Sequence, residues 1–258
     1  MLIDSHAHLD SPGIAERLPE VLEKAHKAGV ERILTIGCVG EDLSVISNVI
    51  NLAETYDGVY AALGVHPHEA QYFNEATGRE LQQAMSHPRV IGWGEIGLDF
   101  HYNHSDKINQ EKAFRRQLEL AQEINQPVVI HSREAANETF AFLNHFSQKG
   151  PLCGVMHCFT YDLATARSFI DLGFLIGFGG ILTFPRSEEL REVARTVPAN
   201  SYLVETDSPY LAPVPHRGKD NEPALVTHIV ETLAQVRSET ESGIAAQTGS
   251  NFENLFLR

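Results

Sequence analysis

The chain begins with Met1-Leu2-Ile3-Asp4-Ser5-His6-Ala7-His8-Leu9-Asp10, a short apolar strand that ends in two histidines. A doubly wound nucleotide-binding sheet normally carries a glycine-rich phosphate loop directly after such an early strand. This stretch contains no glycine, and no G-x-x-x-x-G-K-[ST] pattern occurs anywhere in the sequence. We therefore favour an α/β fold of the closed (β/α)8 TIM-barrel type over an open doubly wound sheet.

Short apolar or β-branched runs recur along the chain, and each is followed by a longer segment with helical spacing. This alternation predicts parallel strands joined by helices, and eight units in about 250 residues is the usual size of a (β/α)8 barrel. The expected strands are Leu2–Ser5, Arg32–Ile36, Val59–Leu63, Val90–Glu95, Pro127–His131, Gly154–His157, Phe174–Phe178 and Tyr202–Glu205. The expected helices include Ile14–Ala28, Leu43–Tyr56, Lys107–Ile124, Glu134–Phe146 and Leu163–Leu172. No linker rich in Pro, Gly or Ser divides the chain, so we expect one hydrolase domain over residues 1–258.

The composition is that of an ordinary globular protein, with 43% hydrophobic and 21% charged residues. The N-terminus lacks the pattern of a secretory signal, and no apolar run approaches the ~20 residues of a membrane span. Three cysteines are too few, and odd in number, for a disulfide framework. We therefore expect a cytoplasmic protein that does not contact membranes.

The formal net charge of −14 argues against a protein that coats nucleic acid through a broad basic surface. Divalent cations change this argument locally, because a metal-loaded site attracts phosphate even when the rest of the surface is acidic.

His6 and His8 are separated by one residue at the end of the first strand, so their side chains project to the same face. Positions facing a barrel interior normally carry Val, Ile or Leu, and two imidazoles there need polar partners. An H-x-H pair is only moderately specific for metal, and a purely structural role is the alternative.

Further ligand-type residues end other expected strands, and barrel enzymes place their active sites at these strand ends. They are Glu95, His131, His157 and Asp207. Together with the two N-terminal histidines they predict a site for two divalent metal ions, and nitrogen and oxygen donors suit zinc, manganese, iron or magnesium. With two ions roughly 3.5 to 4 Å apart, Glu95 is placed to bridge them and Asp207 to accept the proton of the attacking water.

Several motifs make a specific resemblance. They are Asp4-Ser5-His6-Ala7-His8-Leu9-Asp10, Gly64-Val65-His66-Pro67-His68, Gly94-Glu95-Ile96-Gly97-Leu98-Asp99, Pro127-Val128-Val129-Ile130-His131-Ser132-Arg133, His157-Cys158-Phe159 and the run from Glu205 to Pro213. In order and spacing these segments resemble the TatD family of metal-dependent deoxyribonucleases over essentially the whole chain. The run Val214-Pro215-His216-Arg217-Gly218-Lys219 looks most like the YcfH-type bacterial branch.

The resemblance implies a barrel of the amidohydrolase superfamily. In such a barrel His6 and His8 would bind one metal and His131 and His157 the other, while Glu95 bridges and Asp207 completes the site. Members are typically described as magnesium- or manganese-dependent DNases, some with 3′ to 5′ exonuclease action on single strands. Thr160-Tyr161 departs from the commonest family pattern, which leaves the details of specificity open.

Four other residues near the expected site are candidates for substrate binding. His66 would hydrogen-bond a phosphate or a metal-bound water, or only pack beside Pro67. Arg133 would pair with phosphate oxygens, or be a surface charge at the start of a helix. Arg217 and Lys219 would counter the nucleic-acid backbone.

Three acidic residues lie near the expected ligands. Glu205 would orient a metal ligand, or form a salt bridge at the barrel rim. Asp99 and Asp10 lie near the ligands, but either would serve equally well as a helix or turn cap. The cluster Gly177, Gly179 and Gly180 would allow a ligand to approach the backbone, or only a tight turn.

The leading hypothesis is metal-dependent phosphodiester hydrolysis on single-stranded DNA by a monomer. A second hypothesis is hydrolysis of a small-molecule amide, lactone or phosphoester, since the same metal pair polarises these bonds. A third is a metal-stabilised interaction protein without catalysis, although structural sites normally saturate the metal with protein ligands.

Overall fold

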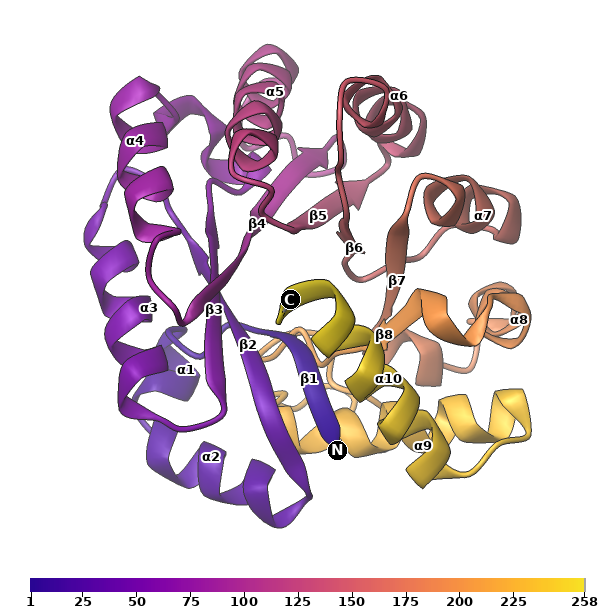
Figure 1. Cartoon of the computed structure of the whole chain (residues 1–258). Coiled ribbons are helices and arrows are strands. Elements are labelled where there is room, and N and C mark those ends of the chain that lie inside the picture. Colours follow the sequence, from indigo (N-terminus) through magenta and orange to yellow (C-terminus); the bar gives the residue numbers. More distant parts are fainter. Residues whose placement is uncertain (258) are drawn as a thin grey trace. The chain divides into compact units, whose positions relative to one another are not determined.

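The structure is a computed structural model that describes residues 1–257, and its eight strands form one parallel sheet in the order β1 to β8 (Figure 1). The strands are β1 (Leu2–Ala7), β2 (Val30–Cys38), β3 (Val59–Gly64), β4 (Val90–Asp99), β5 (Val128–Arg133), β6 (Gly154–Met156), β7 (Phe174–Phe178) and β8 (Tyr202–Val204). This order, with helices between the strands, confirms the expected (β/α)8 class.

The helices follow the expected alternation. They are α1 (Pro12–Ala15), α2 (Leu18–Lys27), α3 (Ser44–Thr55), α4 (Glu75–Ala84), α5 (Lys107–Glu123), α6 (Ala136–Ser147), α7 (Leu163–Asp171), α8 (Glu188–Thr196), α9 (Val226–Arg237) and α10 (Glu241–Phe256). Short 3-10 turns lie at η1 (Pro67–Tyr72), η2 (Gly180–Thr183), η3 (Ala199–Ser201) and η4 (Pro223–Leu225). Among residues 1–257, no helix combines the length and the apolar character needed to cross a membrane.

Several sequence-based bounds were wrong. The strand expected over Val90–Glu95 continues as β4 to Asp99, so Glu95 lies inside the strand rather than at its end. The single helix expected over Ile14–Ala28 is broken into α1 and α2, because Pro19 has no N–H to donate to the Ala15 carbonyl and its ring would clash there. Arg133 was expected to begin a helix, but it ends β5 and the next helix starts three residues later at Ala136.

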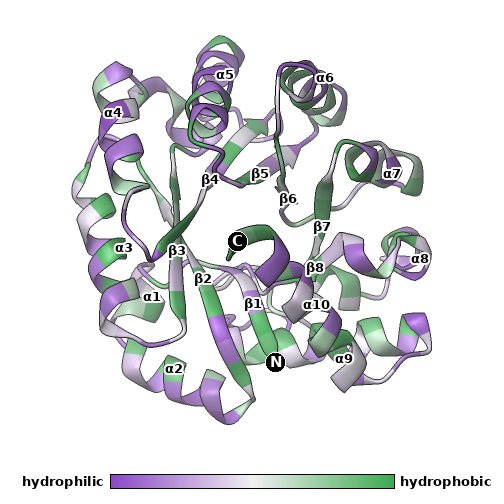
Figure 2. Ribbon diagram, viewed as in Figure 1, coloured by the Kyte–Doolittle hydropathy of each residue, from purple (hydrophilic) through white to green (hydrophobic). Residues whose placement is uncertain are grey.

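The chain divides into two compact units, and the prediction of one domain stays a prediction. Unit 1 comprises residues 1–35, 158–170 and 175 to the end of the described chain. In this unit β1 pairs with the start of β2, β7 pairs with β8, and a parallel bridge joins Ala7 to Ser208. Helix α2 buries Leu18, Val21 and Ala25 at helical spacing, and in Figure 2 it carries both hydrophobic and hydrophilic colours.

Unit 2 comprises residues 36–157 and 171–174, with β3, β4, β5 and β6 in parallel register. Its core includes the fully buried Trp93, whose indole N–H donates to Gln117. Gly97 has a φ of 147°, and a Cβ there would lie 1.9 Å from the His131 carbonyl oxygen. Only glycine allows β4 to approach β5 this closely, and this contact brings the C-terminal halves of the two strands together.

Candidate functional site

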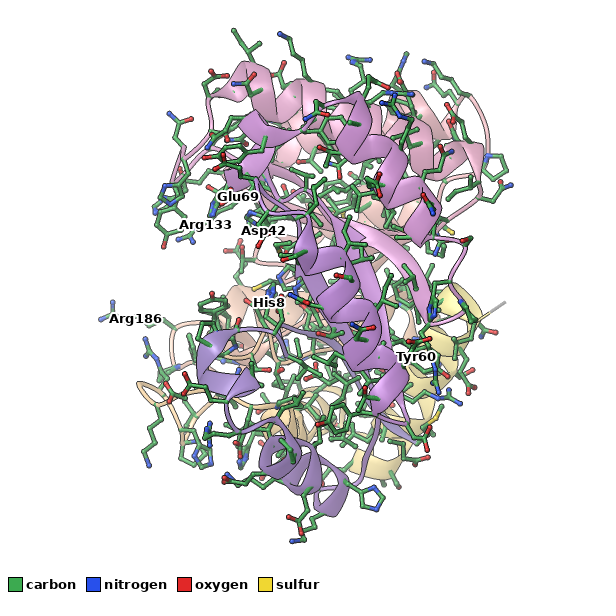
Figure 3. The ribbon with its side chains drawn as sticks, turned by 90° about the vertical axis from the view of Figure 1, so that its left-hand side faces the viewer. His8, Asp42, Tyr60, Glu69, Arg133 and Arg186 are labelled. Atoms are coloured by element: carbon green, nitrogen blue, oxygen red, sulfur yellow. The ribbon has the colours of Figure 1, made fainter. Side chains whose placement is uncertain are left out.

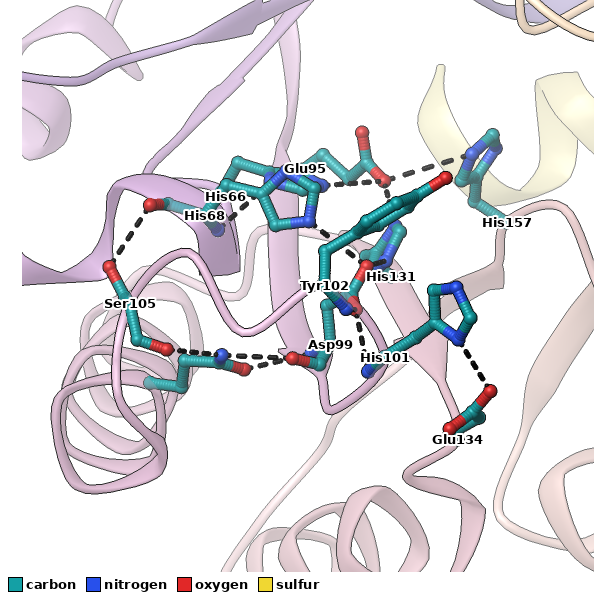
Figure 4. A network of polar contacts seen from close by, with 11 residues as sticks. His66, His68, Glu95, Asp99, His101, Tyr102, Ser105, His131, Glu134 and His157 are labelled. Atoms are coloured by element: carbon teal, nitrogen blue, oxygen red, sulfur yellow. Dashed lines mark hydrogen bonds and ion pairs between the residues drawn. The ribbon is translucent and has the colours of Figure 1, made fainter.

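Unit 2 surrounds one buried carboxylate with imidazole rings (Figure 4). The Oε1 atom of Glu95 lies 2.7 Å from His131 Nδ1, 3.6 Å from His66 Nε2 and 3.7 Å from His157 Nε2. Glu95 is 2% exposed, so its charge depends on these neighbours rather than on water. We call these four residues the Glu95 group.

His131 lies between two carboxylates. Its Nδ1 faces Glu95, and its Nε2 lies 3.0 Å from Asp99 Oδ2. Burial alone would lower the pKa of His131, but hydrogen bonds to Asp99 and Glu95 outweigh burial and raise it. A ring nitrogen held by a carboxylate leaves the other nitrogen oriented for a metal, an arrangement common among metal-ligating histidines.

Asp99 is itself held firmly. Its Oδ1 accepts hydrogen bonds from the backbone N–H groups of His101 and Tyr102, and its Oδ2 lies 3.0 Å from His68 Nε2. Burial alone would raise the pKa of Asp99, but the hydrogen bonds from His131, Tyr102 and His68 lower it well below its usual range. Asp99 therefore caps the turn after β4, which is one of the roles expected from the sequence. It also stays ionised beside the imidazoles of His131 and His68.

The tautomer of His66 determines whether its Nε2 can donate a hydrogen bond or bind a metal. Its Nδ1 accepts the backbone N–H of His68 at 3.1 Å, so the neutral ring carries its proton on Nε2, the atom that faces Glu95. Burial, partly offset by Glu95, lowers the pKa of His66 to about 4, and the ring is neutral at pH 7. His66 lies close enough to Glu95 and His131 to share a metal with them. Because Nε2 carries the proton, His66 is better suited to donate a hydrogen bond than to bind a metal. This agrees with the sequence-based expectation that it hydrogen-bonds a phosphate or a metal-bound water.

His157 directly follows β6, where the strand register orients it. Its backbone N–H donates to the Ile130 carbonyl at 2.9 Å, and the residue is 6% exposed. The hydrogen bond to β5 therefore fixes the backbone of His157, and from there its imidazole reaches Glu95.

Unit 1 contains a second cluster, the Asp207 group, which consists of His6, His8 and Asp207. Asp207 Oδ1 lies 3.5 Å from His8 Nε2 and 3.8 Å from His6 Nε2. One donor atom from each residue lies within 4.8 Å of the others, which is close enough to hold one ion. The three donors are nitrogen and oxygen atoms that suit a divalent cation.

The main chain positions this second cluster. The Asp207 N–H donates to the His6 carbonyl at 2.9 Å, and the His8 N–H donates to the Ser208 carbonyl at 2.8 Å. Asp207 adopts a φ of 58°, a left-handed conformation that aspartate tolerates better than most residues. The backbone of β1 and the segment after β8 thus bring the three donors together.

A buried carboxylic acid lies behind the Asp207 group. Asp4 accepts hydrogen bonds from the Thr206 backbone N–H at 2.8 Å, the Thr206 hydroxyl at 2.6 Å and the His6 N–H at 3.3 Å. Burial raises the pKa of Asp4 to about 7, because these neutral donors only partly offset the loss of water.

Glu205 is a buried carboxylate of unit 1 that is held by hydrogen bonds and packs against a glycine. It is fully buried and accepts the Cys158 backbone N–H at 2.5 Å and the Ser5 hydroxyl at 3.5 Å. A Cβ on Gly177 would lie 2.7 Å from its carboxylate, so this glycine makes room for Glu205. The approach of a ligand to the glycine cluster stays a prediction.

Comparison with known proteins identifies the family. The family model described as TatD related DNase matches residues 3–257. The chain belongs to the TatD-related DNase family. This membership confirms the resemblance and the expectation of a metal-dependent hydrolase, and it covers both the Glu95 group and the Asp207 group.

Relatives agree over nearly the whole length. The uncharacterized metal-dependent hydrolase YcfH of Escherichia coli (strain K12) is 38% identical over 259 residues, covering 99% of this chain and 95% of that protein. The 3′-5′ ssDNA/RNA exonuclease TatD of Klebsiella pneumoniae (strain 342) is 35% identical over 260 residues, covering 99% and 97%. The crystal structure of YJJV, a TatD homolog from E. coli K12, matches with a TM-score of 0.91 and 32% identity, covering 100% and 98%.

The basic residues expected to bind substrate lie against aromatic rings. Arg133 is exposed (Figure 3). Its guanidinium lies 4.5 Å from the centroid of the Tyr102 ring. Arg217 lies 4.2 Å from the centroid of Phe184, and Lys219 is exposed. Pairing of these three cations with substrate phosphates remains a prediction.

Sequence reasoning missed His68 as a member of this TatD-family site. The residue contacts Asp99 through Nε2, and its backbone N–H determines the tautomer of His66. The motif Gly64-Val65-His66-Pro67-His68 contained the signal, because a second histidine two residues after the first lies in the same tight turn.

Proposed function

We propose that this TatD-family chain is a divalent-metal-dependent nuclease that hydrolyses phosphodiester bonds, with single-stranded DNA as its substrate. The observation that carries the proposal is the buried Glu95 carboxylate with imidazole nitrogens facing it and Asp99 behind His131. The relative from K. pneumoniae is named as a 3′-5′ ssDNA/RNA exonuclease, which supports the choice of nucleic acid.

The proposed metal ligands follow the two groups. Glu95, His131 and His157 would hold one ion, and His6, His8 and Asp207 would hold a second. Magnesium, manganese and zinc all accept these donors. A bound ion supplies Lewis-acid polarisation of a phosphoryl oxygen and a lowered pKa for water.

The protein's own residues would perform the remaining steps. Asp207 would accept the proton of the attacking water, because its carboxylate also faces two ring nitrogens that keep it oriented. His66 would donate its Nε2–H to a phosphoryl oxygen, since its pKa of about 4 leaves the ring neutral. Asp99 would keep His131 in a single orientation.

The test uses the purified protein after metal analysis. Labelled single-stranded DNA, double-stranded DNA and RNA are incubated with magnesium, manganese or zinc, beside a matched Glu95→Gln variant. We expect single-stranded DNA to be shortened from its 3′ end, with no cleavage in the presence of a chelator. Cleavage by Glu95→Gln at the wild-type rate would overturn the proposal.

A second candidate function is hydrolysis of a small-molecule amide, lactone or phosphoester. The net charge of −14 favours it, because an acidic surface repels a polyanionic strand. Adding small esters, lactones and amides to the same panel separates the two candidates. Turnover of a small substrate alone would establish the second.

A further inference from the structure

The loop between β4 and α5 presents aromatic side chains to solvent beside the Glu95 group. His101, Tyr102, Asn103 and His104 are all exposed, and Tyr102 is 52% exposed. No residue of this loop is a proposed metal ligand.

The rings of this loop are gathered rather than scattered. Tyr102 and His104 are nearly parallel, with an interplanar angle of 12° and centroids 5.7 Å apart. The edge of His68 meets both, at 5.7 Å from Tyr102 and 4.6 Å from His104. The guanidinium of Arg133 lies over one face of Tyr102, 4.5 Å from the ring centroid, and adds a positive charge. Together Tyr102, His104 and Arg133 form what we call the ring platform.

The ring platform is tied to the Glu95 group. Asp99 accepts the Tyr102 backbone N–H at 2.9 Å through one oxygen and faces His131 Nε2 at 3.0 Å through the other (Figure 4). His68 continues the row inward, with its centroid 4.4 Å from His66 and 6.2 Å from His131. A series of rings therefore leads outward from the proposed metal ligands.

The loop is held in this position at its far end as well. The hydroxyl of Ser105, which is 1% exposed, donates to the His68 carbonyl at 3.0 Å, and Gln110 donates to the carbonyls of Asp99 and Ser105 at 2.9 Å. A pre-organised aromatic surface loses little entropy when it binds a planar ligand.

We propose that the ring platform stacks a nucleobase of a single-stranded nucleic acid whose phosphate lies at the Glu95 group. This inference rests on the proposed function and names the part of the substrate that the chain recognises. Aromatic rings stack any base, and an arginine beside them favours the adjacent phosphate. A duplex cannot use the platform, because its bases are already stacked, which gives a physical reason for a preference for single strands.

The test measures binding apart from cleavage. A single-stranded oligonucleotide with 2-aminopurine near its 3′ end is titrated into protein carrying the inactivating Glu95→Gln change, where fluorescence reports stacking. We expect Tyr102→Ala to abolish most of the quenching and to raise Kd about tenfold, while Tyr102→Phe, which keeps the ring, binds as the parent does.

Tyr60→Ala is the matched control. Tyr60 lies near the N-terminal end of β3 with the guanidinium of Arg89 5.4 Å from its ring centroid, so it shares the tyrosine–arginine pairing without the platform (Figure 3). We expect Tyr60→Ala to leave quenching and Kd unchanged. Thermal melts of all variants check that each is folded.

An abasic residue in place of the 2-aminopurine nucleotide completes the design. If the platform stacks that base, Tyr102→Ala costs no further affinity on the abasic strand. The inference is overturned if the Tyr102→Ala loss persists on the abasic strand, or if Tyr102→Ala binds as tightly as the parent. Failure of the proposed function is seen separately, as wild-type protein that cleaves no nucleic acid with any metal.

Discussion

The Glu95 group and the Asp207 group use similar donors but are positioned in different ways. In the Glu95 group, the side chain of Asp99 fixes His131, and the Nδ1 of that ring faces Glu95. In the Asp207 group, main-chain hydrogen bonds join the segments that carry His6, His8 and Asp207. Side-chain substitution should therefore disturb the orientation of the first group, whereas the second should be sensitive to backbone conformation.

The carboxylates behind the two groups show the same contrast. Asp99 and Asp4 are both buried, yet hydrogen bonds lower the pKa of Asp99 while burial raises the pKa of Asp4 to about 7. Asp99 faces two imidazoles, which can carry positive charge, whereas Asp4 accepts amide and hydroxyl donors and the Glu205 carboxylate raises its pKa further. Hydrogen bonds from groups that can become charged therefore help to keep Asp99 ionised despite its burial.

The largest expected effect is loss of activity when either group loses its carboxylate. Glu95→Gln and Asp207→Asn should each lower kcat by about a thousandfold or more, because several kcal/mol of transition-state stabilisation would depend on the metal that each carboxylate is proposed to hold. Steady-state assays on the best substrate of the panel, with metal analysis of each variant, measure this. Each variant should also lose about one ion per chain.

The same experiment tests whether the Asp207 group binds metal as the Glu95 group is proposed to do. If Asp207→Asn keeps full metal content and wild-type kcat, the Asp207 group is not a metal site. Circular dichroism melts of both variants exclude unfolding as the cause of any loss.

A smaller effect is expected when the support of His131 is removed. Asp99→Asn keeps the shape of the side chain but loses its charge, so His131 is held less firmly and metal affinity should fall about 10- to 100-fold. Isothermal titration of the chelator-stripped protein with zinc or manganese measures the change. The imidazole of His131 should also titrate at lower pH by NMR, because Asp99 raises its pKa in the wild type.

Asp106→Asn is the control for this experiment. Asp106 caps helix α5 by accepting the Asn109 N–H at 2.8 Å, a role that asparagine fills equally well. Unchanged metal affinity in Asp99→Asn would show that Asp99 only shapes the turn after β4.

The sequence was sufficient to predict the strands and the ligand-type residues on them, but not where each strand ends, since β4 continues four residues past Glu95. An apolar run followed by His or Glu is a local pattern, and Glu95, His131 and His157 follow from it. The pairing of Asp99 with His131 is not local, because it depends on the parallel register that places Gly97 opposite His131 across β4 and β5. The tautomer of His66 depends on a backbone N–H in the following turn, which no side-chain pattern encodes.

The third prediction concerns pH and the support of the Asp207 group. The folded protein binds a proton on Asp4 more tightly than the unfolded chain does, since the pKa rises from 3.8 to about 7. Stability conferred by the protonated form is therefore present below the lower value and is lost as the pH rises toward the higher one. Relative to Asp4→Asn, the wild type should lose about 2 kcal/mol of unfolding free energy between about pH 5 and about pH 7.

Urea unfolding of both proteins in chelator, at several pH values, measures this difference. A difference that stays constant with pH would show that Asp4 is ionised in the fold, and the contrast with Asp99 would fail. Chelator keeps metal binding at the neighbouring His6 from contributing its own pH dependence.

The smallest expected effect tests backbone positioning directly. Asp207 has a φ of 58°, where alanine is strained and glycine is not, so Asp207→Gly should be more stable than Asp207→Ala by about 1 kcal/mol. Glu95 lies within β4 and is not among the positive-φ residues of the described chain, so Glu95→Gly should instead be less stable than Glu95→Ala, by about 0.5 to 1 kcal/mol. Chemical denaturation of the four variants in chelator gives both differences. The same order of stability at both positions would mean that main-chain conformation does not distinguish the Asp207 group from the Glu95 group.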